Sequence, residues 1–261
     1  MMITRKKAGL KYYQFETLLF DELTQAVFSR QGGVSPTPWK SLNLGGTVGD
    51  DPDRVLKNRN KLLGSIGYSS KQISQVHQVH SAKVVVVTEP NDNRSVFPQA
   101  DAMITNTPGI LLLMRFADCV PVLFYDPVIK AAGIAHAGWK GTIKEVAFAT
   151  VNKMEKQFGT DPSDLIVGIG PSIGPDHYRV GIDVINGVKN TYGDNWDQVL
   201  TADPDDVKFN LWKANEISLR KAGVLYIETA GICTGCSVDE WYSHRGENGK
   251  TGRFAAVIGL K

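Results

Sequence analysis

Three short apolar segments that follow one another closely, at 110–116, 120–126 and 131–135, constrain the fold of this chain most. Each has the length of a β-strand, and the first shows no polar alternation before Arg115. A strand of this kind is covered on both of its faces. Helical periodicity occurs elsewhere in the chain. We therefore expect an α+β fold in which mixed β-sheets form layers flanked by α-helices, in a single domain over 1–261.

The remaining elements are predicted from the spacing of apolar residues and from the Asp, Pro and Gly residues that begin or end them. One helix begins at Asp51 and Pro52, since aspartate caps a first turn and proline fits its first position, and it ends at Gly67. A second helix follows from Thr142 and Glu145, which match a capping box. It ends at Gly159. β-Branched and apolar runs predict further strands at 12–15, 25–29, 73–87, 165–170, 224–229 and 254–260, and periodicity predicts a third helix at 209–222.

Composition excludes several classes of protein. The net charge of +2 comes without a clustered basic stripe, so we expect no nucleic-acid partner. No apolar run approaches the length of a membrane span, and the N-terminus lacks the apolar core of a signal peptide, so we expect no membrane partner. Three cysteines form an odd set without framework spacing. A reducing cytoplasm is therefore the expected compartment.

Cys119 and His136 are the first candidates for a functional site. They are 17 positions apart and each lies at the end of a predicted strand. A cysteine and a histidine placed in this way can share a metal ion or a proton. His77 and His80 lie upstream in the predicted strand 73–87, where residues three apart face opposite sides. One of these two histidines can join the pair, and the residues alone leave open which one.

Two chemistries fit this set of residues. One cysteine and two histidines leave a fourth tetrahedral position on zinc, which is the pattern of catalytic zinc sites. Alternatively, Cys119 is a thiolate nucleophile with a histidine as its base. A Gly-rich turn, 138–141, follows His136 and contains Lys140 at a predicted helix N-terminus. Such a turn favours anion binding, although it is equally an ordinary connection between a strand and a helix.

Cys233 and Cys236 form a C-x-x-C pair. The pair can be half of a structural zinc site or a redox dithiol, but the sequence contains neither a second pair nor a thioredoxin-like context. We favour the interpretation that Cys233 and Cys236 are small residues in a loop. Asp118, beside Cys119, either orients a ligand or caps a turn.

Several motifs in combination resemble the YfiH/YlmD family, often described as laccase-domain or multicopper polyphenol oxidase proteins, and its YlmD branch most of all. The resemblance runs almost end to end. It rests on SLNLG at 41–45, HQVHS at 77–81, ADCVPVL at 117–123, AHAGWKG at 135–141, GIGPSI at 168–173, YSHR at 242–245 and TGR at 251–253. One departure is that many relatives have two successive arginines where this chain has Arg245 and Gly246.

The resemblance implies a metal site made of His80, Cys119 and His136, which favours His80 over His77. It also implies phosphorolysis of adenosine, inosine and methylthioadenosine to free base and ribose 1-phosphate, with an adenosine deaminase activity. The expected cofactor is Zn²⁺, with Cu²⁺ as an alternative because such ligands favour copper. The expected partners are a nucleoside and phosphate. Candidate substrate or phosphate contacts are Asn43, Arg59, Lys140 and Arg245.

Three alternatives stand beside this hypothesis. One is a cysteine hydrolase that uses Cys119 and His136 to edit peptidoglycan precursors. Another is a weak copper-dependent polyphenol oxidase, although five histidines are too few for the copper set of a true laccase. The last is a non-catalytic protein whose structural zinc takes Cys233 or Cys236 as its fourth ligand.

Overall fold

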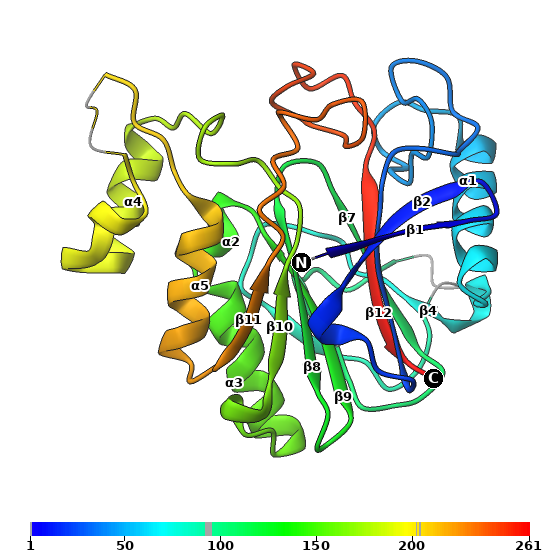
Figure 1. Ribbon diagram of the computed structural model, residues 1–261, viewed down its shortest axis with the longest axis horizontal. Coiled ribbons are helices and arrows are strands. Elements are labelled where there is room, and N and C mark those ends of the chain that lie inside the picture. The colour runs from blue at the N-terminus through cyan, green and yellow to red at the C-terminus, as the bar shows by residue number, and fades with distance from the viewer. Residues whose placement is uncertain (1, 92–95, 202, 204) are drawn as a thin grey trace.

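Two mixed β-sheets form the centre of the protein (Figure 1). The computed structural model describes residues 2–91, 96–201, 203 and 205–261. Over these residues the first sheet has the strand order β1-β2-β3-β12-β7-β4, and the second has the order β11-β10-β8-β9-β6-β5. The bounds are β1 Met2–Lys7, β2 Leu10–Phe15, β3 Leu23–Phe28, β4 Ile73–Ser74, β5 Val84–Val86, β6 Ala102–Thr105, β7 Leu111–Phe116, β8 Val120–Asp126, β9 Ala131–Ala137, β10 Ile166–Ile169, β11 Tyr226–Thr229 and β12 Phe254–Leu260.

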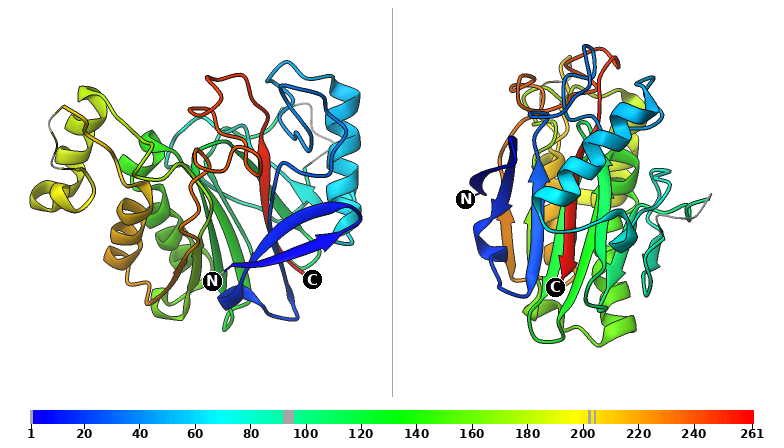
Figure 2. Two further views of the ribbon diagram at one scale, coloured as in Figure 1. Left: turned by 45° about the horizontal axis from the view of Figure 1, so that its top comes forward. Right: turned by 90° about the vertical axis from the view of Figure 1, so that its right-hand side faces the viewer.

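Helices cover the outer face of each sheet. In Figure 1, α1 lies to the right of the strands, and α3 and α5 lie to their left; the first view of Figure 2 shows the same order. The bounds are α1 Pro52–Ser65, α2 Trp139–Ile143, α3 Val146–Phe158, α4 Ile182–Tyr192 and α5 Leu211–Lys221, with short 3₁₀ turns at Glu16–Leu18, Ser70–Gln72, Pro162–Asp164 and Gly193–Gln198. The expected α+β fold, with layered mixed sheets flanked by helices, is confirmed.

Strand β7 shows why its sequence lacks polar alternation. Met114 and Phe116 face the second sheet and pack in a cluster with Ile134 of β9. Leu111 and Leu113 point to the other side and pack against Leu62 and Leu63 of α1. Both faces are therefore buried, and burial of each side chain contributes about 1.5–3 kcal/mol. A third apolar cluster lies between the second sheet and helices α3 and α5.

The predicted strand over 73–87 is only partly correct. The structure forms β4 and β5 at its two ends, and 75–83 is irregular apart from an isolated bridge at His77. The carboxylate of Asp101 explains the interruption, because it accepts hydrogen bonds from the backbone N–H groups of Val79 and Ser81. These two N–H groups are therefore not available for hydrogen bonds to a neighbouring strand. His80, which lies between them, adopts φ +59°. Strand alternation therefore does not govern the two histidines.

The predicted capping box at Thr142 and Glu145 is wrong. Helix α2 already begins at Trp139, and α3 begins after Glu145, which has φ +56° and makes no side-chain cap. Tertiary partners explain the difference. Thr142 is buried and accepts a hydrogen bond from Asn215 of α5. The carboxylate of Glu145 forms an ion pair with Lys221 at 2.9 Å, so neither side chain is available for local capping.

The helix predicted at Asp51 is confirmed, with the Asp51 carboxylate accepting from the N–H groups of Asp53 and Arg54. Strand β1 and helix α4 are elements that the sequence reasoning missed. Among the described residues, no helix combines the length and apolar character needed to cross a membrane.

Candidate metal centre

Three chain segments deliver His80, Cys119 and His136 to one place. Cys119 ends the three-residue connection from β7 to β8, which crosses from the first sheet to the second. His136 lies on β9, opposite Pro121 of β8. His80 comes from the irregular loop between β4 and β5. One ligand atom from each of these three residues lies within 4.8 Å of the others.

The packing around the cluster is close. The rings of His80 and His136 are perpendicular, with centroids 5.0 Å apart, and Phe116 packs at 5.5 Å from the His136 ring. Gly138 lies against the sulfur, because a Cβ atom built there would lie 2.7 Å from the Cys119 Sγ atom. A glycine is therefore needed at this position to leave room for the thiol.

Asp101 orients His136. Its Oδ1 atom lies 2.9 Å from His136 Nδ1, while its Oδ2 atom accepts from Ser81 N and Ser81 Oγ at 2.6 and 2.8 Å. Burial would raise the pKa of Asp101, but the hydrogen bonds from His136 and Ser81 hold that pKa well below its usual value. The ionised carboxylate fixes the proton on Nδ1, which directs the other ring nitrogen of His136 toward the cluster. Metal-binding histidines are commonly held in this way.

The charges of the cluster suit a cation. Burial on its own would raise the pKa of the Cys119 thiol, but His136 and His80 outweigh it and lower that pKa to about 6. Burial disfavours a charged His136, yet the Cys119 thiolate and Asp101 raise the pKa of its ring to about 9. Both shifts favour the pair of a thiolate and an imidazolium when no metal is bound. A divalent ion replaces that proton, and two nitrogens with one thiolate are ligands that zinc and copper accept.

Replacing Asp101 by asparagine should weaken metal binding by about 10- to 100-fold. The amide can accept from His136 only by turning its NH₂ group toward the N–H groups of Val79 and Ser81. Competition with a chelator of known affinity measures the loss. Asp126→Asn is the matched control, because this buried carboxylate accepts backbone N–H groups at the far end of β8. An Asp101 variant with the affinity of this control would contradict the assignment.

Asp118 is a buried anchor for the C-terminal loop. It adopts φ +81°. Its Oδ1 atom accepts from Thr234 Oγ1 and Ser243 Oγ, both at 2.7 Å, and its Oδ2 atom accepts from the backbone N–H of Arg245 at 2.6 Å. The sequence left open that Asp118 orients a ligand or caps a turn, whereas its contacts are with Thr234, Ser243 and Arg245 of the C-terminal loop. Asp118 fastens the loop 234–245 beside Cys119.

Arg253 and Tyr178 lie within the electrostatic influence of Cys119, and Arg245 packs on Tyr178. Burial lowers the pKa of the Arg253 guanidinium, while the negative charges of Cys119 and Asp118 oppose that change. Burial raises the pKa of the Tyr178 phenol well above its usual value, and the charge of Cys119 adds to this effect. The guanidinium of Arg245 lies 5.3 Å from the Tyr178 ring centroid and donates to the carbonyl of Arg179. The charge of Cys119 therefore acts on both Arg253 and Tyr178, and Arg245 packs against the Tyr178 ring.

The other predicted substrate contacts lie in different settings. Asn43 is fully buried, and its amide bonds internally to Gly45, Asp50 and the N–H of Arg253. It is suited to positioning Arg253. Arg59 lines a cavity of about 210 Å³ on the α1 side of the first sheet, together with Arg115. Lys140 is exposed, with its Nζ atom 5.4 Å from the ring centroid of Trp139.

Cys233 and Cys236 do not join His80, Cys119 and His136. They form a separate cluster with Asp176 and His177. The closed zinc site that the sequence left open, with one of these cysteines as fourth ligand, is therefore not formed in the described part of the chain.

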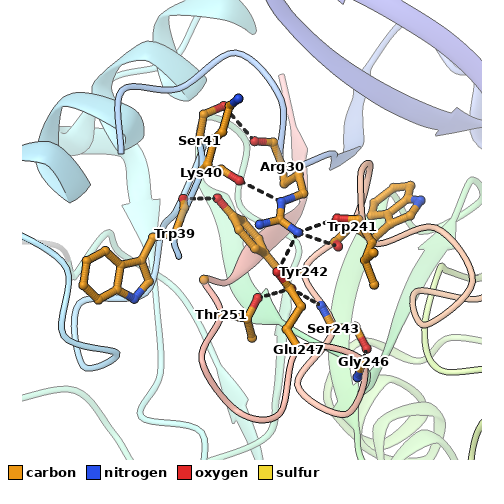
Figure 3. A network of polar contacts seen from close by, with 12 residues as sticks. Arg30, Trp39, Lys40, Ser41, Trp241, Tyr242, Ser243, Gly246, Glu247 and Thr251 are labelled. Atoms are coloured by element: carbon orange, nitrogen blue, oxygen red, sulfur yellow. Dashed lines mark hydrogen bonds and ion pairs between the residues drawn. The ribbon is translucent and has the colours of Figure 1, made fainter. Parts of the chain in front are cut away.

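A network of polar contacts around Arg30 holds the C-terminal loop that carries Arg245 and Arg253 (Figure 3). Arg30 forms an ion pair with Glu247 at 2.9 Å, donates to the carbonyl of Lys40 and stacks 4.3 Å from the Tyr242 ring centroid. Glu247 in turn accepts from the N–H of Ser243 and from Thr251 Oγ1. The network joins the loop after β3 to the segment between Arg245 and Arg253.

Arg30→Met should lower the free energy of unfolding by about 2 kcal/mol, because it leaves the half-buried Glu247 carboxylate without its cation and removes charged hydrogen bonds. Denaturant titration measures the change. Arg5→Met is the matched control, since Arg5 is an exposed arginine of β1 that bonds to Gln14, and it should shift stability by less than about 0.5 kcal/mol. Equal stability of the two variants would contradict the role of the network.

Sequence reasoning missed Asp101, Tyr178 and Arg253 as site residues. Asp101 offered one signal, a carboxylate at the start of an apolar strand. Arg253 lay within a recognised motif, but its position beside Cys119 depends on the path of the whole C-terminal loop.

Comparisons with known proteins identify the family and support the fold. The model of the family described as "Multi-copper polyphenol oxidoreductase laccase" matches residues 24–261. A Deinococcus radiodurans protein named purine nucleoside phosphorylase is 37% identical over 90% of this chain and 88% of its own length. Geobacillus stearothermophilus purine nucleoside phosphorylase YlmD is 35% identical over 89% of this chain and 88% of its own. The crystal structure of YlmD from that organism superposes with a TM-score of 0.92 and 31% identity, covering 100% of both chains.

Proposed function

The chain belongs to the laccase-like family of multi-copper polyphenol oxidoreductases, whose YlmD members are named purine nucleoside phosphorylases, and from this membership we propose that it cleaves purine nucleosides with phosphate. The proposed substrates are adenosine, inosine and methylthioadenosine. The observation that carries the proposal is the convergence of His80, Cys119 and His136 within 4.8 Å, with His136 oriented by Asp101.

We propose Zn²⁺ as the ion that these three residues hold. Three protein ligands leave a fourth coordination position free, as in catalytic zinc sites. When bound, the metal supplies a fixed positive charge and a Lewis acid beside the substrate. Cys119 contributes its thiolate, and Asp101 keeps the His136 ring in the orientation that binding needs.

Arg253 is the proposed phosphate ligand. The negative charge of Cys119 acts on its guanidinium, and its backbone N–H donates to Asn43 Oδ1 at 2.9 Å. A planar guanidinium pairs with two phosphate oxygens at once, which both binds the anion and orients it. Arg245, anchored through its N–H to Asp118, is the second candidate for this role. In the reaction, a phosphate oxygen forms a bond to the ribose C1′ atom as the bond to the base breaks.

Tyr178 is the proposed donor to the leaving base. Its raised pKa keeps the phenol protonated at neutral pH, so the group remains a hydrogen-bond donor beside the cluster. A ring nitrogen of the purine carries the electron pair of the broken bond, and a donor at that nitrogen stabilises the developing negative charge.

The same site supports a second proposed reaction, deamination of adenosine to inosine. It uses water in place of phosphate and acts on the purine ring at C6 instead of the ribose. The two reactions therefore differ in their dependence on phosphate, and their products separate cleanly.

Incubation of the pure protein with adenosine, with and without phosphate, tests the proposal. With phosphate, the amount of ribose 1-phosphate should equal the sum of adenine and hypoxanthine, since inosine formed by deamination is itself cleaved, and inosine should form in either condition. Without phosphate, free base should not accumulate. Absence of ribose 1-phosphate with every one of the three nucleosides would contradict phosphorolysis, and absence of inosine would contradict the deaminase activity.

A cysteine hydrolase is a second candidate, because Asp101, His136 and Cys119 also form a carboxylate–histidine–thiolate series. Such an enzyme acts on acyl substrates, including peptidoglycan precursors, without a metal. Its activity would survive chelation and disappear after alkylation of Cys119. His80 distinguishes the two proposals, since a thiolate and base need no second histidine, whereas a metal site does.

Weak copper-dependent oxidation of polyphenols is the third activity that we propose for the same cluster. The family description supports it, and the ligands bind copper readily. The chain contains five histidines, too few for the copper set of a true laccase. A polyphenol oxidation rate that does not rise with added Cu²⁺ would contradict it.

A further inference from the structure

A second group of potential ligands lies away from the proposed nucleoside site. We propose that Asp176, His177, Cys233 and Cys236 bind a structural zinc ion that ties the loop after β10 to the loop after β11. Each of the four residues offers one ligand atom, and these atoms lie within 4.8 Å of one another. Two thiolates, an imidazole and a carboxylate make a complete tetrahedral set for zinc.

The distances fit such a site. His177 Nδ1 lies 3.4 Å from Cys236 Sγ and 3.7 Å from Cys233 Sγ. Zinc bonds of about 2.3 Å to sulfur and about 2.0–2.2 Å to nitrogen or oxygen, at tetrahedral angles, separate neighbouring ligand atoms by roughly 3.3–3.8 Å. Asp176 Oδ2 lies slightly closer, at 3.0 Å from Cys236 Sγ and 2.9 Å from His177 Nδ1. Its side chain is 53% exposed, so it can move outward by the required amount.

The backbone already holds the two halves of the site together. Ser172 N donates to the carbonyl of Ile232 at 3.1 Å, and Thr234 N donates to the carbonyl of Ser172 at 2.9 Å. The N–H of Gly174 donates to Cys233 Sγ at 3.2 Å. Hydrogen bonds to a ligand atom orient it and are a regular feature of metal sites. The site is therefore preorganised before an ion arrives.

Burial of the four residues favours a structural role. Cys233 is buried, while Asp176, His177 and Cys236 are exposed, so an ion enters from solvent and is closed in by four protein atoms. No coordination position remains for a substrate when all four bind. The site is thus distinct in kind from the three-residue cluster at Cys119.

The same two loops carry residues of the proposed active site. Thr234, between the two cysteines, donates to Asp118 at 2.7 Å. Tyr178 follows His177 directly in the chain. An ion that fixes the two loops therefore also fixes the positions of Thr234 and Tyr178 beside Cys119.

Sequence spacing could not identify this set. The C-x-x-C pair has no second pair in the chain, and its partners are an Asp-His dipeptide more than fifty residues upstream. The parallel bridge between Ser172 and Cys233 brings them together.

Zinc stoichiometry of the reduced, metal-stripped full chain tests the proposal, independently of any catalytic activity. After equilibration with Zn²⁺ and removal of the excess, elemental analysis should find two ions per wild-type chain. Cys233→Ser with Cys236→Ser should retain one ion, and so should Cys119→Ala. Asp239→Asn, an exposed carboxylate of the same loop, is the matched control and should retain both.

Thermal unfolding provides a second measurement. In the Cys119→Ala chain, which keeps only the second site, Zn²⁺ should raise Tm, and adding His177→Ala should abolish the increase. His177→Ala also replaces the double-cysteine variant if that variant fails to fold. A zinc content that is the same in the wild-type chain and in the folded second-site variants, or a Cys233–Cys236 disulfide in the zinc-treated protein, would overturn the proposal. A wild-type chain that holds one ion and loses it with Cys233→Ser and Cys236→Ser would instead contradict zinc binding by His80, Cys119 and His136.

Discussion

Cys119→Ala should abolish phosphorolysis, lowering kcat/KM for purine nucleosides by about 10³-fold or more. The change removes the one thiolate of the three-ligand cluster while leaving the neighbouring strands β7 and β8 intact. A bound metal contributes several kcal/mol of transition-state stabilisation, and each 1.36 kcal/mol changes the rate tenfold. Initial rates of base release, measured beside the zinc content of the same sample, test this expectation.

The two histidines at 77 and 80 provide the matched control. His80→Ala removes a second member of the cluster and should cost as much activity as Cys119→Ala. His77 is exposed, and the contacts that bind it to the fold come from its backbone, through Pro98 and Ala100. His77→Ala should therefore retain wild-type activity. Equal losses in the two histidine variants, or full activity in Cys119→Ala, would contradict the assignment of the ligands.

Arg253→Met should raise the KM for phosphate by about 100-fold while leaving the KM for the nucleoside nearly unchanged. A lost bidentate pair between a guanidinium and a phosphate costs about 2.8 kcal/mol on this scale, because each 1.4 kcal/mol is tenfold in affinity. The methionine keeps the backbone N–H that bonds to Asn43, so the loop retains this anchor. Initial rates at varied phosphate concentration measure the effect.

Two further variants separate phosphate binding from loop packing. Arg253→Lys keeps the positive charge but lacks the paired N–H donors of a guanidinium, so it should recover part of the phosphate affinity that Arg253→Met loses. Arg179→Met removes an exposed arginine that donates to the carbonyl of Asp205 and forms an ion pair with Asp206, and it should leave both KM values unchanged. The Arg253 guanidinium also donates to the carbonyls of Thr251 and Gly252. Parallel rises in both KM values would assign it to packing alone and contradict the phosphate role.

The elements that could be predicted from sequence are those whose signal lies within the element itself, in a continuous apolar run or in a helix cap. The apolar runs of β7, β8 and β9 identified three strands, and Asp51 with Pro52 identified the start of α1. These signals survive because both faces of the strands are covered and because the Asp51 cap forms within its own helix. Layered sheets with outer helices followed from the same patterns.

The predictions that failed depended on partners far away in the sequence. Asp101 draws the N–H groups of Val79 and Ser81 out of the strand predicted at 73–87, and this turns His80 toward Cys119. Lys221 of α5 pairs with Glu145 and removes it from the capping box. Propensity describes a residue and its near neighbours, whereas these contacts are set by how the two sheets and the helices pack.

The candidate site divides in the same way. Cys119 and His136 could be predicted because each lies at the end of a recognisable strand. The choice of His80 over His77 rested on family resemblance, and the structure places His80 in the cluster. Tyr178, Asp101 and Arg253 come from three separate segments, and only the fold shows that Asp101 contacts His136 and that Tyr178 and Arg253 lie near the charge of Cys119.

A zinc titration of phosphorolysis tests the role of the three-residue cluster, in metal-stripped protein that carries Cys233→Ser and Cys236→Ser. This chain retains the cluster of His80, Cys119 and His136 as its proposed zinc site. Formation of ribose 1-phosphate from inosine should require both phosphate and zinc, and should reach its maximum at one zinc ion per chain. Full activity without any metal, or no activity at full zinc occupancy with any of the three nucleosides, would contradict the account.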